Sequence, residues 1–275
     1  MRPGDSAAAA ARLQQSADAH GGPAWRQLLD INVAYDGQWR PLIGSVQPEV
    51  VDAGYRGPVQ DRLLLQQRMA AQAHTGPRGV KQVLWRRGQA AAPNAANNAA
   101  AEPAAVQVWY DGVESRSEPL RTAAAVVAEC YGLFLLGPLW LVGRGLPMQL
   151  AGSERVDGRL CDVIDIWMTP GLGFSAQDRV ALCVDRADHV TRRMRFTLEG
   201  FAGTRGAVAQ TDTFDHQRRF GVLWPMRSYE EVVHPIRLPA HDWRITGLDV
   251  NRGYGVDALQ GPRFSGAAAA PAAAL

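Results

Sequence analysis

The histidines, carboxylates and cysteines are the residues of this chain that could do chemistry, and their spacing limits which chemistry that is. The six histidines are scattered and form neither an HExxH nor an HxH motif, so no metal site is predicted. Two of them adjoin an aspartate, in Asp215-His216 and His241-Asp242. Neighbouring residues of a strand point to opposite faces, so neither pair can easily bind one metal ion. We therefore expect surface or rim histidines.

Nucleophile and phosphate-binding motifs are missing as well. Neither 173–175 (GFS) nor 264–266 (FSG) completes the GxSxG sequence that a serine nucleophile of the hydrolase type requires. The glycines of 203–206 (GTRG) are not followed by GK[ST], so this segment is predicted to be a turn. Glu230-Glu231, or Asp212 with Asp215, could act as paired carboxylates, but carboxylates on one segment are usually solvated. The sequence predicts a protein that is not an enzyme and that uses no metal or cofactor.

The three cysteines, Cys130, Cys161 and Cys183, have no CxxC spacing. If the strands around Cys161 and Cys183 form a hairpin closed by 170–175, the two cysteines are equidistant from residue 172 and face each other. Two alternatives follow, a disulfide or two buried thiols. Cys130, within an apolar stretch, is predicted to be a small core residue.

Charge argues against nucleic acid as a partner. The chain has 29 basic and 27 acidic residues, and Lys81 is its only lysine. Nucleic-acid binding needs clustered positive charge, whereas the densest basic runs here, 192–195 and 218–219, are short. These runs are predicted to be solvated strand faces, with contact to an acidic headgroup as the alternative.

One long apolar stretch, 123–142 (AAAVVAECYGLFLLGPLWLV), interrupts a sequence that otherwise alternates like short strands. It is long enough to cross a membrane. Against a span, Glu129 lies inside it, Gly137-Pro138 breaks it, and a span would place strands of one sheet on opposite sides of the membrane. We expect instead a helix over 120–142 that packs against the concave face of a curved sheet.

The remaining elements are predicted from periodicity and turn residues. A helix is expected over 7–19, and Asp36-Gly37 predicts a tight hairpin between a strand ending near Tyr35 and a second strand over 38–47. Meander order without alternating helices predicts one antiparallel sheet of about eleven strands and argues against Rossmann and TIM-barrel folds. The other strands are expected near 61–74, 80–87, 106–110, 149–155, 159–168, 178–184, 189–199, 206–215, 222–233 and 241–251.

The expected domain organisation has three parts: an N-terminal helix or tail over 1–22, one domain over 23–255, and a disordered Ala/Pro-rich tail over 256–275. Residues 89–105 (QAAAPNAANNAAAEPAA) have little to bury and are predicted to be a surface loop inserted between two strands. The N-terminus lacks the continuous apolar region of a signal peptide. Two alternatives remain: a cytoplasmic protein, or a protein whose leader lies upstream of the given sequence.

Short motifs in the second half resemble the outer-membrane lipoprotein-sorting superfamily, the LolA- and LolB-like proteins and their uncharacterised relatives. The motifs are 156–164 (VDGRLCDVI), 184–185 (VD), 193–195 (RMR), 220–225 (FGVLWP) and 245–251 (ITGLDVN). The resemblance covers about 23–255. It implies an α+β fold, a half-open, strongly curved antiparallel β-barrel with a helical lid on its concave face. It also implies acyl chains in the cavity and a periplasmic or envelope-associated location.

Together these observations predict non-catalytic binding or carriage of a hydrophobic ligand, such as a lipid, an acyl chain or the lipid part of a lipoprotein. An envelope protein or a membrane surface is a further candidate partner. The alternatives are an interaction or sensor module whose sheet is filled by its own helix and, third, a hydrolase. The predicted ligand-binding residues are Trp85, Trp109, Leu135, Leu136, Trp140, Leu141, Met194, Phe196 and Trp224.

Overall fold

The computed structural model describes residues 3–88, 102–259, 261 and 264. Its strands are β1 (Asp30–Trp39), β2 (Val59–Leu64), β3 (Met69–Gly76), β4 (Gly79–Arg86), β5 (Ala105–Tyr110), β6 (Val113–Glu114), β7 (Met148–Val156), β8 (Arg159–Met168), β9 (Asp178–Asp185), β10 (Thr191–Thr197), β11 (Val208–Phe214), β12 (Gln217–Arg219), β13 (Val222–Trp224), β14 (Arg227–His234) and β15 (Leu238–Val250). Thirteen of them form one antiparallel sheet in the order β6-β5-β4-β3-β2-β1-β15-β14-β11-β10-β9-β8-β7, and β12 and β13 pair separately. The two edge strands, β6 and β7, do not pair with each other, so the described sheet is open.

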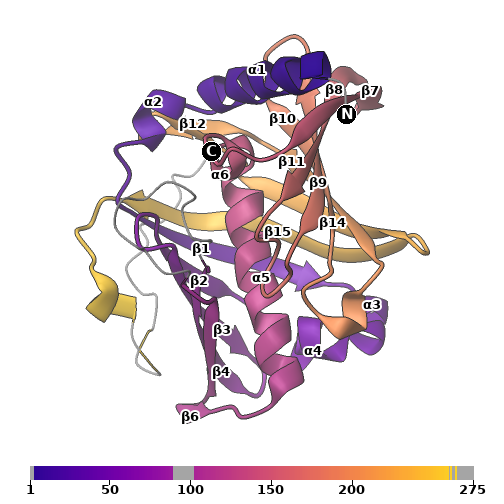
Figure 1. Ribbon diagram of the computed structural model, residues 1–275. Helices are drawn as coiled ribbons and strands as arrows, with labels where there is room; N and C mark the ends of the chain where they lie inside the picture. The colour runs from indigo at the N-terminus through magenta and orange to yellow at the C-terminus, as the bar shows by residue number, and fades with distance from the viewer. Residues whose placement is uncertain (1–2, 89–101, 260, 262–263, 265–275) are drawn as a thin grey trace.

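The helices are α1 (Pro3–Ala19), α2 (Gly22–Trp25), α3 (Pro41–Val46), α4 (Pro48–Val51), α5 (Glu118–Leu136) and α6 (Pro138–Leu141), with the short 3-10 helices η1 (Ala53–Tyr55), η2 (Ala202–Thr204) and η3 (Val256–Leu259). Figure 1 shows α5 crossing the face of the curved sheet, with α1 at one end and α3 and α4 at the other. The expected α+β architecture, a curved open sheet around one long helix, is confirmed.

α5 is a core helix. By length and mean hydropathy (1.3) it could cross a membrane, but 78% of that stretch is buried inside the protein. Every residue from Ala123 to Leu136 is buried. The helix ends at Gly137, whose backbone φ is +50°, and Pro138 begins α6 in a new direction. The sheet buries the apolar side chains of α5, as a helix that is apolar on all sides requires.

Alternation of side chains along the strands sets the two faces of the sheet. On β10, Met194 and Phe196 are buried beneath α5, whereas Arg193 and Arg195 lie on the outer face. The Asp157-Gly158 turn between β7 and β8 has positive φ at both residues, as a tight two-residue hairpin requires.

Three predictions about strands are wrong. The predicted strand 222–233 is two strands, β13 and β14, which belong to different sheets. The predicted strand 61–74 is two strands, β2 and β3, joined by a turn, which accounts for part of the difference between eleven strands and thirteen. Asp36-Gly37 is not a hairpin, because β1 continues to Trp39. Gly37 is needed there for close packing, since a Cβ on it would lie 2.4 Å from the Asp242 carbonyl oxygen of β15. The chain then forms α3 and α4, where a second strand was predicted.

The ends of the chain also pack on the sheet. α1 buries Ala9, Leu13 and Ala17 in the same core as α5. The predicted disordered tail begins with η3, whose Leu259 is buried in a small cluster with Phe264 on the outer side of β2 and β3. Most of this tail, and residues 89–101 of the predicted loop, lie outside the described residues.

Candidate ligand-binding site

The nine predicted ligand-binding residues are mostly packed in the core. Eight are buried and Trp140 is half-buried. Trp109 follows Val108, a core residue beneath α5, so its side chain lies on the outer face and cannot line the concave one. Trp85 and Trp140 border a cavity of only about 50 Å³. The ligand-binding role of the nine stays a prediction, and the structure leaves the larger apolar space elsewhere.

An apolar pocket of about 300 Å³ lies at the end of the concave face that α5 does not cover. We call it the end pocket. Its floor and one wall come from β11, β14 and β15, and its other wall comes from α3 and α4. The loop around η2 completes it. The lining residues are Trp39, Ile43, Val46, Gln47, Val50, Leu198, Gly203, Thr204, Arg205, Ala207, Ala209, Glu230, Val232, Pro235, Ile236, Leu238 and Ala240.

Residues 41–55, which we call the cover segment, form one side of this pocket. Proline occupies the first turn of both α3 and α4, a position where its missing N–H is not needed. Ile43 and Val51 are buried against Leu238 and Ala240 of β15. Apolar burial therefore holds the cover segment on the sheet.

Polar contacts beneath the cover segment also hold it on the sheet. Asp52 has a left-handed backbone (φ 50°) and accepts two hydrogen bonds of 2.7 Å, from Lys81 Nζ and from the Tyr110 hydroxyl. Arg56 donates to the carbonyl oxygens of Val51 (2.8 Å) and Val50 (2.9 Å). Burial, and then the neighbouring Arg56, lowers the pKa of Lys81 to about 8. The only lysine of the chain is thus a buried anchor with 1% of its side chain exposed.

Three polar side chains lie next to one another on adjacent strands, and one of them, Glu230, lines the end pocket. Glu230 of β14 is the register partner of Thr211 on β11 and of His241 on β15, so all three project from the same face. Within the described parts of the chain, none of these side chains makes a hydrogen bond. Thr211 Oγ1 is buried without a partner. His241 is stacked between Trp39 (ring centroids 4.3 Å apart) and Trp243 (4.7 Å). We call these three residues the polar row.

Burial opposes charge on Glu230 and His241. It raises the pKa of Glu230 to about 8, an effect that Arg56 partly opposes. Burial, and then Arg56, holds the pKa of His241 well below its usual value. The row therefore combines a carboxyl group, an imidazole and a hydroxyl group, and together these groups can donate and accept hydrogen bonds.

In the described residues, no serine or cysteine is paired with a histidine that could activate it as a nucleophile. The histidine side chains make no hydrogen bond to a serine or cysteine there, and that contact was the feature that would favour a hydrolase. Burial raises the pKa of the Cys130 thiol well above its usual value, so this cysteine is inert. The described residues also contain no cluster of three or more side chains that could hold a metal ion.

Of the two alternatives for Cys161 and Cys183, the structure contains two buried free thiols. Their strands do pair, but Cys161 lies opposite Asp185 and Cys183 lies opposite Val163. The two cysteines are therefore diagonal neighbours, because the hairpin is centred one residue later than predicted.

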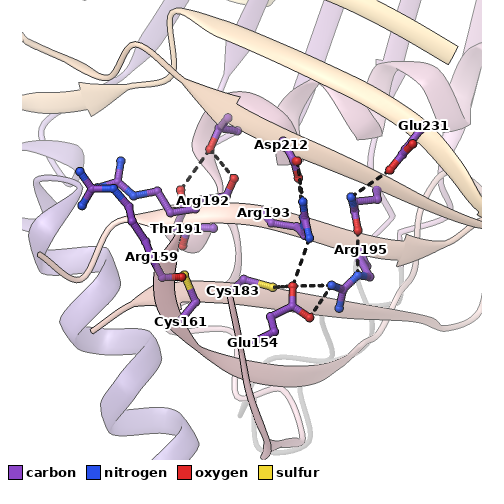
Figure 2. A network of polar contacts seen from close by, with 12 residues as sticks. Glu154, Arg159, Cys161, Cys183, Thr191, Arg192, Arg193, Arg195, Asp212 and Glu231 are labelled. Atoms are coloured by element: carbon purple, nitrogen blue, oxygen red, sulfur yellow. Dashed lines mark hydrogen bonds and ion pairs between the residues drawn. The ribbon is translucent and has the colours of Figure 1, made fainter. Parts of the chain in front are cut away.

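The outer face of the sheet carries paired charges (Figure 2). Glu154 of β7 accepts hydrogen bonds from Cys183 (3.2 Å) and Arg193 (3.4 Å) and pairs with Arg195. Arg193 also forms a two-point ion pair with Asp212, at 2.5 and 2.7 Å. A depression of about 380 Å³ adjoins this network, but its charged lining is already paired. We interpret this face as structural, and much of the basic run 192–195 as neutralised.

Glu230 makes a contribution to stability that falls as the pH rises, whereas His241, whose pKa is lowered from 6.5, contributes a change of opposite sign below that pH. In the unfolded chain Glu230 ionises near pH 4.5, its ordinary value, whereas in the folded chain its pKa is about 8. The folded protein keeps a proton that the unfolded chain has lost, so the free energy of unfolding decreases across this window and then levels off. Asp61, whose pKa burial raises to about 7, acts in the same direction.

Urea unfolding at several pH values checks this expectation. Glu230→Gln should flatten the slope between about pH 4.5 and 8, because glutamine does not titrate. Glu118→Gln, at an exposed position at the start of α5, should leave the slope unchanged. Equal slopes for the wild type and Glu230→Gln would contradict the assignment of a buried acid.

The sequence matches no protein-family model and no curated protein. Among solved structures, the chain is similar to a DUF1329 family protein from Desulfovibrio piger, with a TM-score of 0.54 and 10% identity over 93% of this chain and 99% of that one. It is also similar to a LolA superfamily protein from Nitrosomonas europaea, with a TM-score of 0.51 and 12% identity over 90% of this chain and 96% of that one. The resemblance read from the sequence is thus confirmed in three dimensions, and the chain has the fold of the LolA superfamily.

Proposed function

We propose that this protein binds and carries a single apolar chain, such as the acyl chain of a lipid, in the end pocket. The observation that carries the proposal is an apolar hollow of about 300 Å³ on the concave face of the sheet. Pockets for small ligands are mostly apolar clefts of roughly 300–1,000 Å³ with a few polar groups, and the end pocket meets both conditions.

The distribution of apolar space favours a carrier over a module whose sheet is filled by its own helix. α5 does fill the middle of the concave face, as the interaction-module alternative expected. The end pocket, however, lies between the cover segment and strands β11, β14 and β15, and residues of both sides line it. A pocket between a helical cover and a curved sheet is what a carrier needs.

The rim of the end pocket supports a membrane surface as the place of loading. Leu42, Val46 and Ile236 are large apolar residues with 59%, 52% and 63% of their surface exposed, and the last two line the pocket. Apolar side chains around a mouth let an acyl chain leave a membrane without crossing water. An envelope location is part of this proposal and rests on the fold alone.

Substituting a charged residue at the rim of the end pocket tests the proposal. Val46→Asp and Ile236→Asp should each weaken binding of a fluorescent fatty-acid probe by about tenfold, because an apolar chain would then lie against a solvated carboxylate. Both positions are exposed, so the fold should be kept. Val113→Asp, equally exposed but on β6 and outside the pocket, is the matched control.

Native mass spectrometry of the purified protein provides the second measurement. Co-purified lipid, or a stoichiometric complex after incubation with a fatty acid, is the expected result. If the wild-type protein binds no apolar probe, or if Val113→Asp weakens binding as much as the rim variants do, the end pocket is not a ligand site.

A further inference from the structure

We infer that the ligand of the end pocket carries a hydroxyl group at the inner end of its apolar chain, and that this group binds the carboxyl group of Glu230. This inference rests on the proposed function and names the ligand class. The hydroxyl group donates a hydrogen bond to Glu230, and the chain runs along the apolar walls to the mouth. A fatty alcohol and an acyl chain that is hydroxylated at its end share this chemistry.

The polar lining of the end pocket has one member without a partner. Four residues with charged, amide or hydroxyl side chains line the pocket: Gln47, Thr204, Arg205 and Glu230. Gln47 and Thr204 each donate to a carbonyl oxygen of the segment between β10 and β11, at 2.6 and 2.8 Å. Arg205 forms an ion pair of 4.0 Å with Glu199. Within the described parts of the chain, Glu230 alone of the four makes neither a hydrogen bond nor an ion pair.

The carboxyl group of Glu230 can be reached from the end pocket. Glu230 lines the pocket and is half-buried. Neither of its carboxyl oxygens is fully enclosed by the described protein, whereas the Oγ1 atom of its neighbour Thr211 is. A ligand in the pocket therefore meets Glu230 and does not meet the Thr211 hydroxyl group.

Glu230 lies at the inner end of the pocket. Its register partners on the two adjacent strands, Thr211 and His241, have 0% and 4% of their surface exposed. Val46 and Ile236, at the mouth, are more than half exposed. The inner end of a wholly apolar chain would press against the carboxyl group and leave it without a partner, which is unfavourable. A chain with a polar inner end matches the pocket along its whole length.

The partner that Glu230 requires is a hydrogen-bond donor. A carboxyl group offers an acceptor oxygen whether or not it holds a proton, so this requirement does not depend on its charge. Ester, ether and carboxylate groups have no hydrogen to donate, whereas hydroxyl and ammonium groups do. An ammonium group would lose its hydration in an apolar pocket, and it would pass Arg205, the other charged residue of the lining. A hydroxyl group is neutral, and it pairs with both forms of the carboxyl group.

Two matched pairs of probes test this inference by displacement of a fluorescent fatty-acid probe at about pH 7. The first pair is dodecan-1-ol and its methyl ether, and the second is 12-hydroxydodecanoic acid and dodecanoic acid. The hydroxylated member should bind the wild-type protein about tenfold more tightly, because its counterpart leaves Glu230 unpaired. A preference in the first pair alone identifies a fatty alcohol, and a preference in the second identifies a hydroxylated acyl chain.

Substitutions of Glu230 show whether this residue causes the preference. Glu230→Leu should abolish it in both pairs, because leucine has no acceptor. Glu230→Gln should keep it, because the amide oxygen still accepts a hydrogen bond. The measured quantity is the ratio of two affinities of one variant, so a general loss of folded protein does not change it. Glu114→Leu, at an exposed position on β6 and outside the pocket, is the matched control.

The outcomes distinguish the inference from the proposed function. If the members of both pairs bind the wild-type protein equally well, or if Glu230→Leu keeps the preference, the inward hydroxyl group is wrong while the apolar carrier stands. Tighter binding of dodecylamine than of dodecan-1-ol would also overturn the inference, because the donor would then be a cation. If none of these probes binds, the proposed function itself fails.

Discussion

Replacing Glu129 with leucine should lower the free energy of unfolding by about 3–5 kcal/mol, because the change leaves a buried arginine without its partner. Glu129 has 1% of its side chain exposed, accepts a hydrogen bond of 2.8 Å from Trp85 Nε1, and pairs with Arg87. Arg87 has 11% of its side chain exposed and stacks on Trp140 at 3.9 Å. Loss of the carboxylate removes the charge partner of Arg87 and the acceptor of Trp85 together.

Urea unfolding followed by tryptophan fluorescence measures this effect, and two variants control it. Glu118→Gln, at the exposed start of the same helix, should change stability little. The double variant Glu129→Leu/Arg87→Leu should recover much of the loss, because it removes both charges. A loss below about 1 kcal/mol for Glu129→Leu would mean that water already compensates the pair.

The second large effect is expected at Lys81, beneath the cover segment. Lys81→Met should cost about 3–5 kcal/mol, since Asp52 then keeps its charge in a largely buried position with only the Tyr110 hydroxyl as partner. The end pocket should suffer as well, because Asp52 directly follows α4. Affinity for an apolar probe should therefore fall together with stability.

A double-mutant cycle separates charge from packing at this position. In Lys81→Met/Asp52→Asn both charges are absent, and the cost should be clearly smaller than the sum of the two single changes. Strict additivity would show that the 2.7 Å contact between Lys81 and Asp52 contributes no coupling energy. The cover segment would then be held mainly by the burial of Ile43 and Val51 and by the hydrogen bonds of Arg56.

The sequence predicted the long-range plan of the fold because that plan follows from hydrophobic pattern. The apolar stretch after Glu118 is too long and too uniformly apolar for a surface helix, and period-two alternation on both sides of it requires a sheet. The tight Asp157-Gly158 turn could be predicted because a turn with two successive residues of positive φ has a strong sequence preference. Each of these signals is local.

The candidate site was missed because its signals are not local. Asp36-Gly37 has the composition of a hairpin, yet Gly37 serves a close approach to β15, a strand some two hundred residues away. A turn at Asp36-Gly37 predicts a strand over 38–47, where the structure has α3 at the start of the cover segment, and so leaves the pocket without this wall. The polar row depends on the register of β11, β14 and β15, and a one-residue slip would send its side chains to the other face.

One signal in the sequence could have pointed to the site. Proline recurs at positions 41 and 48, and its missing N–H suits a helix start better than the interior of a strand. The nine predicted residues are large apolar side chains of the helical stretch and of the sheet. Such residues more often fill a core than line a cavity, because burying them is itself the main stabilising effect.

The single lysine gives this protein an unusual chemical character. Amine-directed reagents, whether acylating agents, cross-linkers or conjugating enzymes, find no other side-chain amine in the sequence, and this one has 1% of its side chain exposed beneath Asp52. We expect such a reagent to reach Nζ when the cover segment lifts from the sheet, because Asp52 of that segment is its ion-pair partner. The rate of acylation at Lys81 therefore reports how often the cover segment opens, and the measurement needs no substitution in the chain.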